Sequence, residues 1–397
     1  MLPAPEKIAA LARKLHPTQV KWRRHFHRYP ELSNKEFETT AFIRKILKQH
    51  RIDLIPVALE TGAASLIRGS GTRTAALRTD IDALAVTERN DIPYRSKYNG
   101  VMHACGHDIH MAVVLGATVL LKKIQKDLPG NVTTIYQPSE EEPPGGARRM
   151  IESGVLENPA VGMVFGLHTD PTIAPGKISL RDGPTMAAVM DFDLTIRGLG
   201  GHAAAPHKTV DAVAVAAEVV ESLQKVVSRE TNPMEPAVIT FGTISGGTMR
   251  NVIAEQVVLK GTARTLSDKT RRQLPRLIKR TLSGICRARG AGFDLEIKAG
   301  YPVLENHPAA NLILRESYLE LFGGGNVKET KAVMGGEDFS FYLREKPGAM
   351  FRLGIRNPEI GATRPWHASD FMADEESIFY GTALLVKAVL RYLDRGK

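Results

Sequence analysis

A thiol and an imidazole stand two residues apart in the segment 103–110, at Cys105 and His107. A second reactive segment follows at 137–146, where Glu140 and Glu141 are adjacent. Cysteine, histidine and carboxylate side chains are the ligands that zinc prefers, and catalytic zinc sites leave one position to water. The two segments together therefore predict a metal-dependent hydrolase.

Two further histidines extend this donor set. His168 follows the apolar run 163–167, and His367 stands in a loop after Pro365. A single histidine is more often solvated or hydrogen-bonded than bound to a metal, so the prediction depends on the whole group and leaves His103 and His110 outside it. One cysteine sulfur can bridge two metal ions. The candidate ligands are Cys105, His107, Glu141, His168 and His367.

The acidic run 140–142 is compatible with two interpretations. Charge runs usually form solvated loops, but here the apolar segment 131–136 immediately precedes the carboxylates. Consecutive residues that leave a strand point in opposite directions. We therefore expect Glu141 to bind metal and Glu140 to face the substrate as the general base that takes a proton from an activated water.

Other catalytic systems fit the sequence less well. Cys105 and His107 as a nucleophile and base would be too close in sequence for the required geometry, and the chain has no Gly-x-Ser-x-Gly elbow. The stretch 198–203 matches a dinucleotide-binding glycine pattern, but His202 and Pro206 interrupt the expected start of a phosphate-binding helix. We interpret this stretch as a loop that presents His202 as a hydrogen-bond donor to an oxyanion.

Length and composition describe the class of protein. A chain of 397 residues suggests two domains. Two cysteines give no disulfide framework, and neither a secretory pattern nor an apolar run of about 20 residues occurs, so we expect a cytoplasmic enzyme that does not span a membrane. The net charge of +10 comes from scattered basic residues without interleaved aromatics, which favours a solvated surface over nucleic-acid binding.

The reactive residues follow predicted strands of an α/β core. Three strand ends present carboxylates or imidazoles: Asp80 and Asp82, the 140–141 pair, and His168. Ligands gather at the carboxyl ends of strands in open α/β sheets. The expected strands are 55–59, 64–68, 74–78, 131–136 and 163–167, and the expected helices are 5–27, 34–49, 110–125 and 377–393.

The pattern changes near residue 184. Residues 189–197 alternate between apolar and polar as a half-buried strand does. A helix at 210–228, strands at 237–245 and 256–265, a helix at 270–289 and a strand at 293–299 follow. This β-α-β-β-α-β order is typical of a ferredoxin-like unit. The sequence thus predicts a catalytic domain formed by 1–183 and 298–397, with an inserted domain at 184–297.

Several ordered motifs resemble those of the M20 metallopeptidase family, in its amidohydrolase branch of aminoacylases, hippurate hydrolases, auxin-conjugate hydrolases and certain carboxypeptidases. The resemblance covers nearly the whole chain. Beside the Cys105 and Glu140 segments, it is carried by residues 24–32, 77–84, 166–168, 200–207, 251–253 and 335–339. Departures occur at Ser139, at residues 142–144 and at Ala254, and they affect loop shape and substrate choice rather than the ligands.

The resemblance implies a zinc-peptidase-like catalytic domain with a mixed sheet and an α+β lid that also forms a homodimer. It implies two divalent metal ions, zinc or else cobalt, nickel or manganese, held by the five candidate ligands with Cys105 bridging. Glu140 would be the base, and Asp82 would orient a metal-binding histidine. His202 would reach a partner's site from the lid, and Asn251 and Arg264 would hold the substrate.

The expected reaction is hydrolysis of an amide bond next to a free carboxylate, in an N-acyl amino acid or at a peptide C-terminus. A deacetylase of amino-acid biosynthesis, of the N-acetyl amino acid or diaminopimelate type, is the alternative within the same chemistry. A non-catalytic binding protein on the same scaffold is the alternative from another class, and an intact base and ligand set argue against it.

Overall fold

The computed structural model describes residues 2–395, which form two compact units. Of these residues, the first unit contains 2–183, 305–331 and 338–395, and the second contains 184–304 and 332–337. The sequence predicted an insertion at 184–297. The continuous segment of the second unit runs from 184 to 304, and strand β13 (Gly292–Ala299) passes through residue 297.

The first unit is built on a mixed eight-stranded sheet with the order β1-β2-β4-β3-β5-β16-β6-β15. Strand β3 pairs in parallel with β4 and β5, while β1, β2 and β4 are joined by antiparallel pairs. The strands are β1 (Asp53–Ile55), β2 (Ala63–Ile67), β3 (Thr74–Asp80), β4 (Asn131–Gln137), β5 (Met163–Asp170), β6 (Ile178–Leu180), β15 (Val327–Glu329) and β16 (Gly348–Gly354). The central strands are buried along their whole length, as their continuous apolar runs require.

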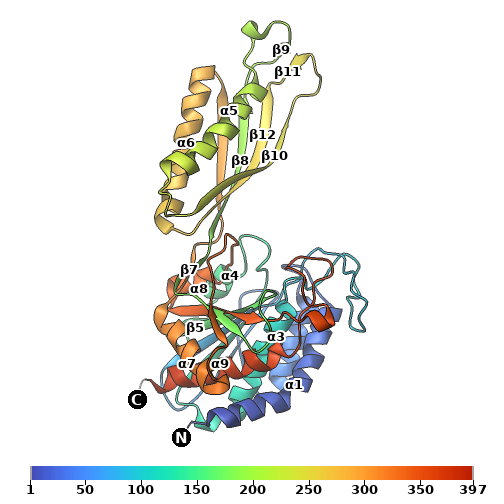
Figure 1. Ribbon diagram of the computed structural model, residues 1–397, viewed down its shortest axis with the longest axis vertical. Coiled ribbons are helices and arrows are strands. Elements are labelled where there is room, and N and C mark those ends of the chain that lie inside the picture. Colours follow the sequence, from blue (N-terminus) through green and yellow to red (C-terminus); the bar gives the residue numbers. More distant parts are fainter. Residues whose placement is uncertain (1, 396–397) are drawn as a thin grey trace. The chain divides into compact units, whose positions relative to one another are not determined.

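Helices of the first unit cover this sheet. Helices α1, α3, α7 and α9 pack against one another (Figure 1), and α3 is buried from His107 to Leu121 because it is apolar on most faces. The helices are α1 (Pro5–Arg28), α2 (Phe37–Gln49), α3 (His107–Lys123), α4 (Ala147–Glu152), α7 (Pro308–Phe322), α8 (Ser340–Glu345) and α9 (Ser377–Asp394). Short 3-10 turns lie at 125–127 and 358–360.

Two sequence expectations for the first unit are wrong in detail. The strand expected at 55–59 is instead β1 at Asp53–Ile55, and it ends before Pro56, which cannot donate a ladder hydrogen bond. The helix expected from Asn34 begins at Phe37, since Asn34 adopts a left-handed backbone with φ 64°. Residues 33–36 therefore form a turn ahead of α2 rather than its first helical turn.

The second unit has its own sheet and core. Its main elements follow the order β-α-β-β-α-β, and its antiparallel sheet has the order β10-β12-β8-β13 with α5 and α6 packed together (Figure 1). The elements are β8 (Ala188–Arg197), α5 (Ala212–Lys225), β10 (Ala237–Gly246), β12 (Gln256–Thr265), α6 (Asp268–Arg289) and β13. The short strands are β9 (Gly201–His202) and β11 (Val252–Ile253), and helical turns occupy 206–208 and 226–230. Strands β7 (Gly183–Met186) and β14 (Leu304–Asn306) stand where the chain passes between the units.

This arrangement is the ferredoxin-like topology expected for the inserted segment. Its buried side chains form a hydrophobic cluster separate from that of the first unit. Among the described residues, no helix combines the length and apolar character that crossing a membrane requires.

Candidate metal centre and active site

Strand pairing brings the reactive segments of the first unit to one edge of the sheet. Because β3, β4 and β5 are parallel, their carboxyl ends lie on the same side. The register pairs Asp80 with Gln137, the residue from which the chain continues toward Glu140. Arg78 pairs with Gly166, which places His168 level with Asp80.

The five candidate ligands meet at this edge in two groups that share one sulfur. Cys105, His107 and His168 offer donor atoms that all lie within 4.8 Å of one another, and so do Cys105, Glu141 and His367. The Cys105 Sγ atom lies 3.5 Å from His168 Nε2. The structure thus brings together all five residues that the sequence nominated, in two groups of three donors that both include Cys105.

The chemistry of the donor atoms fits a cation. His107 Nε2 and Glu141 Oε1 are buried and 3.8 Å apart, and neither has a hydrogen-bond partner among the described residues. His367 Nε2 approaches the same Glu141 oxygen at 3.5 Å. Buried polar atoms are almost always satisfied, so the unpaired His107 and Glu141 atoms, with the His367 nitrogen beside them, indicate a place for a metal ion.

Burial shifts the pKa values of Cys105 and His168 in the metal-free protein, whereas burial alone would lower the pKa of His107 and the charges of Asp80 and Cys105 raise it. Burial and the nearby Glu141 carboxylate raise the pKa of the Cys105 thiol well above its ordinary value. Burial and the Arg352 guanidinium hold the pKa of His168 well below its ordinary range. Such a thiol is a poor nucleophile at neutral pH, which argues against the Cys105–His107 nucleophile, whereas a bound cation would stabilise its thiolate.

Asp82 holds two of the ligands. The His107 Nδ1–H group donates to the Asp82 carbonyl oxygen at 2.9 Å and lies 3.4 Å from carboxylate Oδ1, so Nε2 is left free for a metal. The Asp82 Oδ2 atom accepts the Glu141 backbone N–H at 3.0 Å. Asp82 is fully buried, and although burial alone would raise its pKa, the hydrogen bond with His107 and the His107 charge bring it below the ordinary value.

Gly106 allows the chain to place Cys105 and His107 on either side of a sharp turn. It adopts a left-handed backbone with φ 89°, and a Cβ atom there would stand 2.8 Å from the Thr169 side chain. Thr169 in turn donates its hydroxyl to the Cys105 carbonyl at 2.9 Å. Glycine is therefore required both by the backbone angle and by the close approach.

Glu140 lies beside the ligands. It is 7% exposed, and one of its oxygens lies within 4.8 Å of donor atoms of both His107 and Glu141. This is the neighbourhood that a base acting on a water at the metal ions needs.

The candidate lid residues lie in the second unit. His202 is exposed on β9, which pairs with β11, and the Ala203 N–H donates to the Asn251 carbonyl at 3.1 Å. The Ala204 N–H donates to His202 Nδ1 at 3.0 Å, which places the imidazole proton on Nε2. The structure brings His202 and Asn251 together within this unit, and no dinucleotide-binding helix starts at this loop.

Arg264 lies on β12, in the four-stranded sheet of the second unit. It pairs with Val189 near the start of β8, whereas β9 follows the end of β8 at Arg197. At about 3.3 Å per residue, the two ends of β8 are roughly 26 Å apart. Within one copy of this unit, the structure therefore does not bring Arg264 together with His202.

Comparison with known proteins places this site in a family. Residues 76–391 match the model of peptidase family M20/M25/M40. The chain belongs to the M20 family. It is a metal-dependent hydrolase of the amidohydrolase and carboxypeptidase type.

Three relatives resemble this M20 chain over almost its whole length. An N-acetyl-L-cysteine deacetylase of Bacillus subtilis is 40% identical to this chain, over 94% of this chain and 87% of the length of the deacetylase. The thermostable carboxypeptidase 1 of Saccharolobus solfataricus is 36% identical to this chain, over 95% of the length of each protein. A solved structure of a dinuclear metal-binding M20 peptidase from Bacillus subtilis matches with a TM-score of 0.85 and 32% identity, over 96% of this chain and 99% of that one.

A buried network behind the M20 site contains residues that the sequence did not nominate. His110 uses both ring nitrogens, at 2.7 Å to Asp80 and 2.8 Å to the Thr169 N–H, so it supports the site rather than binding metal. Arg78 joins Asp80 to Asp338 through hydrogen bonds of 2.9 and 2.7 Å. In the sequence, the 335–339 motif marked Asp338 without revealing its partner.

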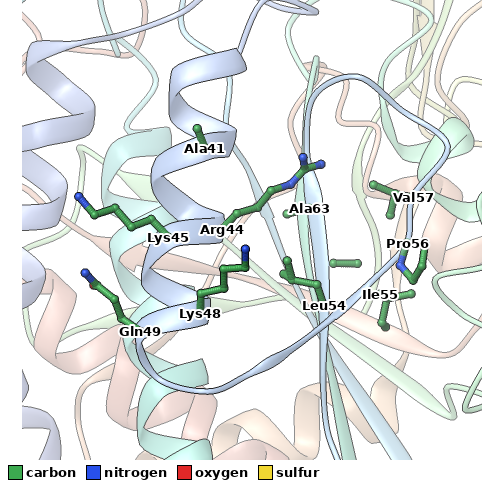
Figure 2. A pocket seen from close by; sticks show the side chains of 11 residues that line it. Ala41, Arg44, Lys45, Lys48, Gln49, Leu54, Ile55, Pro56, Val57 and Ala63 are labelled. Carbon is green, nitrogen blue, oxygen red and sulfur yellow. The ribbon is translucent and has the colours of Figure 1, made fainter.

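A cavity of about 730 Å³ lies elsewhere in the same unit, between α2 and the segment after β1 (Figure 2). Arg44 and Lys48 extend into it from α2, opposite Leu54 and Val57. None of the candidate metal ligands lines it. The M20 site is therefore identified by its donor atoms and not by this cavity.

Proposed function

We propose that the chain hydrolyses the amide bond next to a free carboxylate, in an N-acyl amino acid or a C-terminally cleaved peptide, with two divalent metal ions. The observation that carries the proposal is the pair of three-donor groups that share Cys105 beside Glu140. The similarity to a deacetylase of an N-acyl amino acid and to a carboxypeptidase supports this substrate class.

The proposed metals are zinc ions. Cys105, His107 and His168 would hold one ion, while Cys105, Glu141 and His367 would hold the other. A donor set of thiolate, imidazole and carboxylate suits zinc, and cobalt, nickel or manganese can bind the same atoms. Bound there, the ions supply Lewis acidity toward a water molecule and the substrate carbonyl.

Glu140 moves the protons in this proposal. Its carboxylate accepts a proton from the attacking water and later gives that proton to the leaving amine, so that one residue acts as base and then as acid. Burial at 7% exposure keeps bulk water from competing for that proton.

The lid residues bind the substrate in this proposal. The proton on His202 Nε2 can be donated to the oxygen that becomes negative during attack, and Asn251 and Arg264 would hold the rest of the substrate. The separation of about 26 Å between the two ends of the lid sheet is too long for one small substrate to touch both from the same copy. This supports a homodimer in which His202 serves the partner's site.

Amine release from a panel of N-acyl amino acids and dipeptides tests the proposal, with metal-stripped and metal-restored protein. We expect release that returns when zinc is restored. Glu140→Ala should abolish turnover while the bound metal, measured by elemental analysis, stays near two per chain. Substantial activity in Glu140→Ala would show that Glu140 is not the general base. Failure to release amine with any restored metal would favour a non-catalytic binding protein.

A deacetylase specific for small acyl groups is the second candidate. The 40% identity to an N-acetyl-L-cysteine deacetylase favours it. The same panel separates the two, because a deacetylase should release amine from N-acetyl amino acids far faster than from dipeptides or from longer acyl groups.

A further inference from the structure

We propose that Glu36 is a positioning residue that sets the direction of the Glu140 side chain by holding the loop 138–142 from behind. The proposal rests on the base role proposed for Glu140. Glu36 is 0% exposed and stands at the N-cap of α2, yet its side chain does not cap that helix. Instead, its Oε1 atom accepts the backbone N–H of Ser139 at 2.8 Å.

The base is held on both sides. Glu36 holds the N–H of the residue before Glu140, and Asp82 holds the N–H of Glu141 after it, at 3.0 Å. Two buried carboxyl groups from different segments thus hold the 138–139 and 140–141 peptide groups, one on each side of Glu140. A buried hydrogen bond on each side restricts the backbone of this stretch, so Glu140 has little freedom to rotate with it.

Ser139 needs such a restraint. Its backbone is left-handed with φ 54°, a conformation that costs a non-glycine residue about 1 kcal/mol or more and persists only where surrounding contacts offset that cost. The Ser139 hydroxyl accepts a second hydrogen bond, from Asn34 Nδ2 at 3.0 Å. Ser33 completes the contact by donating its hydroxyl to Asp82 Oδ2 at 2.7 Å. The turn at 33–36 therefore supports the loop directly through Asn34 and Glu36, and through Ser33 by way of Asp82.

The position of Glu36 is unfavourable for stability alone. Burial, and then the negative charge of nearby Asp82, raise the pKa of Glu36 to about 7. A buried carboxyl group beside a second carboxylate costs free energy. Such local conflicts are characteristic of functional positions, where precision is needed more than stability.

Three substitutions at Glu36 and one matched control test the proposal in the metal-loaded protein. Glu36→Ala and Glu36→Leu remove the acceptor, and Glu36→Leu fills the vacated volume. Glu36→Gln keeps an acceptor oxygen. Glu31→Ala is the control, because Glu31 accepts the N–H groups of Glu38 and Thr39 at the same helix start but does not touch the loop.

We expect kcat to fall about 10- to 100-fold in Glu36→Ala and Glu36→Leu, as for the loss of supporting contacts in other sites. KM and the bound metal should change little, and Glu36→Gln should recover most of kcat. Glu31→Ala should keep the kcat of the parent enzyme. Rescue by glutamine, together with loss of kcat at constant KM, would not arise from a purely structural role.

Three results would overturn the proposal. One is a kcat near the parent value in both Glu36→Ala and Glu36→Leu, and another is an equal loss in Glu31→Ala. The third is failure of both variants to fold, which would assign Glu36 to stability. The parent enzyme and Glu140→Ala are measured first, so that a failure of the proposed function itself shows as an inactive parent or an active Glu140→Ala variant.

Discussion

Replacing Asp82 by alanine tests whether the buried carboxylate prepares the metal ligands. The change removes the Oδ1 atom 3.4 Å from His107 Nδ1 and the Oδ2 acceptor of the Glu141 N–H. The carbonyl of residue 82 still holds His107 at 2.9 Å, so the ring keeps its tautomer. What is lost is one charge-assisted hydrogen bond and one close electrostatic contact.

The size of the effect follows from these contacts. A hydrogen bond to a charged group is worth roughly 1.5–3 kcal/mol, and each 1.4 kcal/mol is about tenfold in a dissociation constant. We therefore expect Asp82→Ala to weaken metal binding about 10- to 100-fold, in the range known for partners of metal ligands. Competition against a chromophoric chelator measures this Kd, with folding checked by circular dichroism.

Ser33→Ala is the matched control for Asp82→Ala. It removes only the hydroxyl that donates to Asp82 Oδ2 at 2.7 Å and leaves both ligand contacts in place. Its metal affinity should fall much less than that of Asp82→Ala. A folded Asp82→Ala protein whose Kd stays within about twofold of the parent value would refute the reasoning, since even one lost charged hydrogen bond should exceed that.

Two further perturbations follow from the site. Gly106→Ala should lower both the thermal unfolding temperature and the metal content. The left-handed backbone costs alanine about 1–2 kcal/mol, and the new Cβ atom would stand 2.8 Å from the Thr169 side chain. An unchanged unfolding temperature together with an unchanged metal content would contradict this. In the metal-free protein, the pKa of about 7 at Glu36 lies above the unfolded value near 4.5, so protonation of this carboxyl group favours the folded state. The resulting contribution of roughly 3 kcal/mol is fully present below pH 4.5 and is lost as the pH rises through 7. Urea unfolding should thus show that Glu36→Gln loses less stability than the parent between pH 5 and pH 8, and equal losses would argue against the raised pKa.

The ligands could be predicted from the sequence because their chemistry is local. Cys105 and His107 stand two residues apart, and an apolar strand precedes Glu140 and Glu141. Such patterns depend on residue type and on strand periodicity, which one sequence displays. Strand β13 passes through residue 297, where the sequence pattern places the end of the insertion.

The supporting residues could not be predicted in the same way. Arg78 and Asp338 are 260 positions apart, and the strand pattern around Arg78 gives no sign that a guanidinium is buried there. Glu36 follows three polar residues and falls in the first turn of the helix expected at 34–49, where nothing in the sequence marks its carboxylate as buried. Contacts that depend on which distant segments meet are set by tertiary packing, and a single sequence contains no direct record of them.

All five candidate metal ligands belong to the first unit, while the inserted segment 184–304 has a hydrophobic core of its own. A substitution inside the insertion can therefore be absorbed by that core without disturbing the donor atoms. The packing of the insertion and the arrangement of the metal ligands are thereby separate constraints on the sequence. Changes in the core of the insertion can accumulate while the five donor atoms keep their places, so the stability of one unit and the metal site of the other can evolve independently.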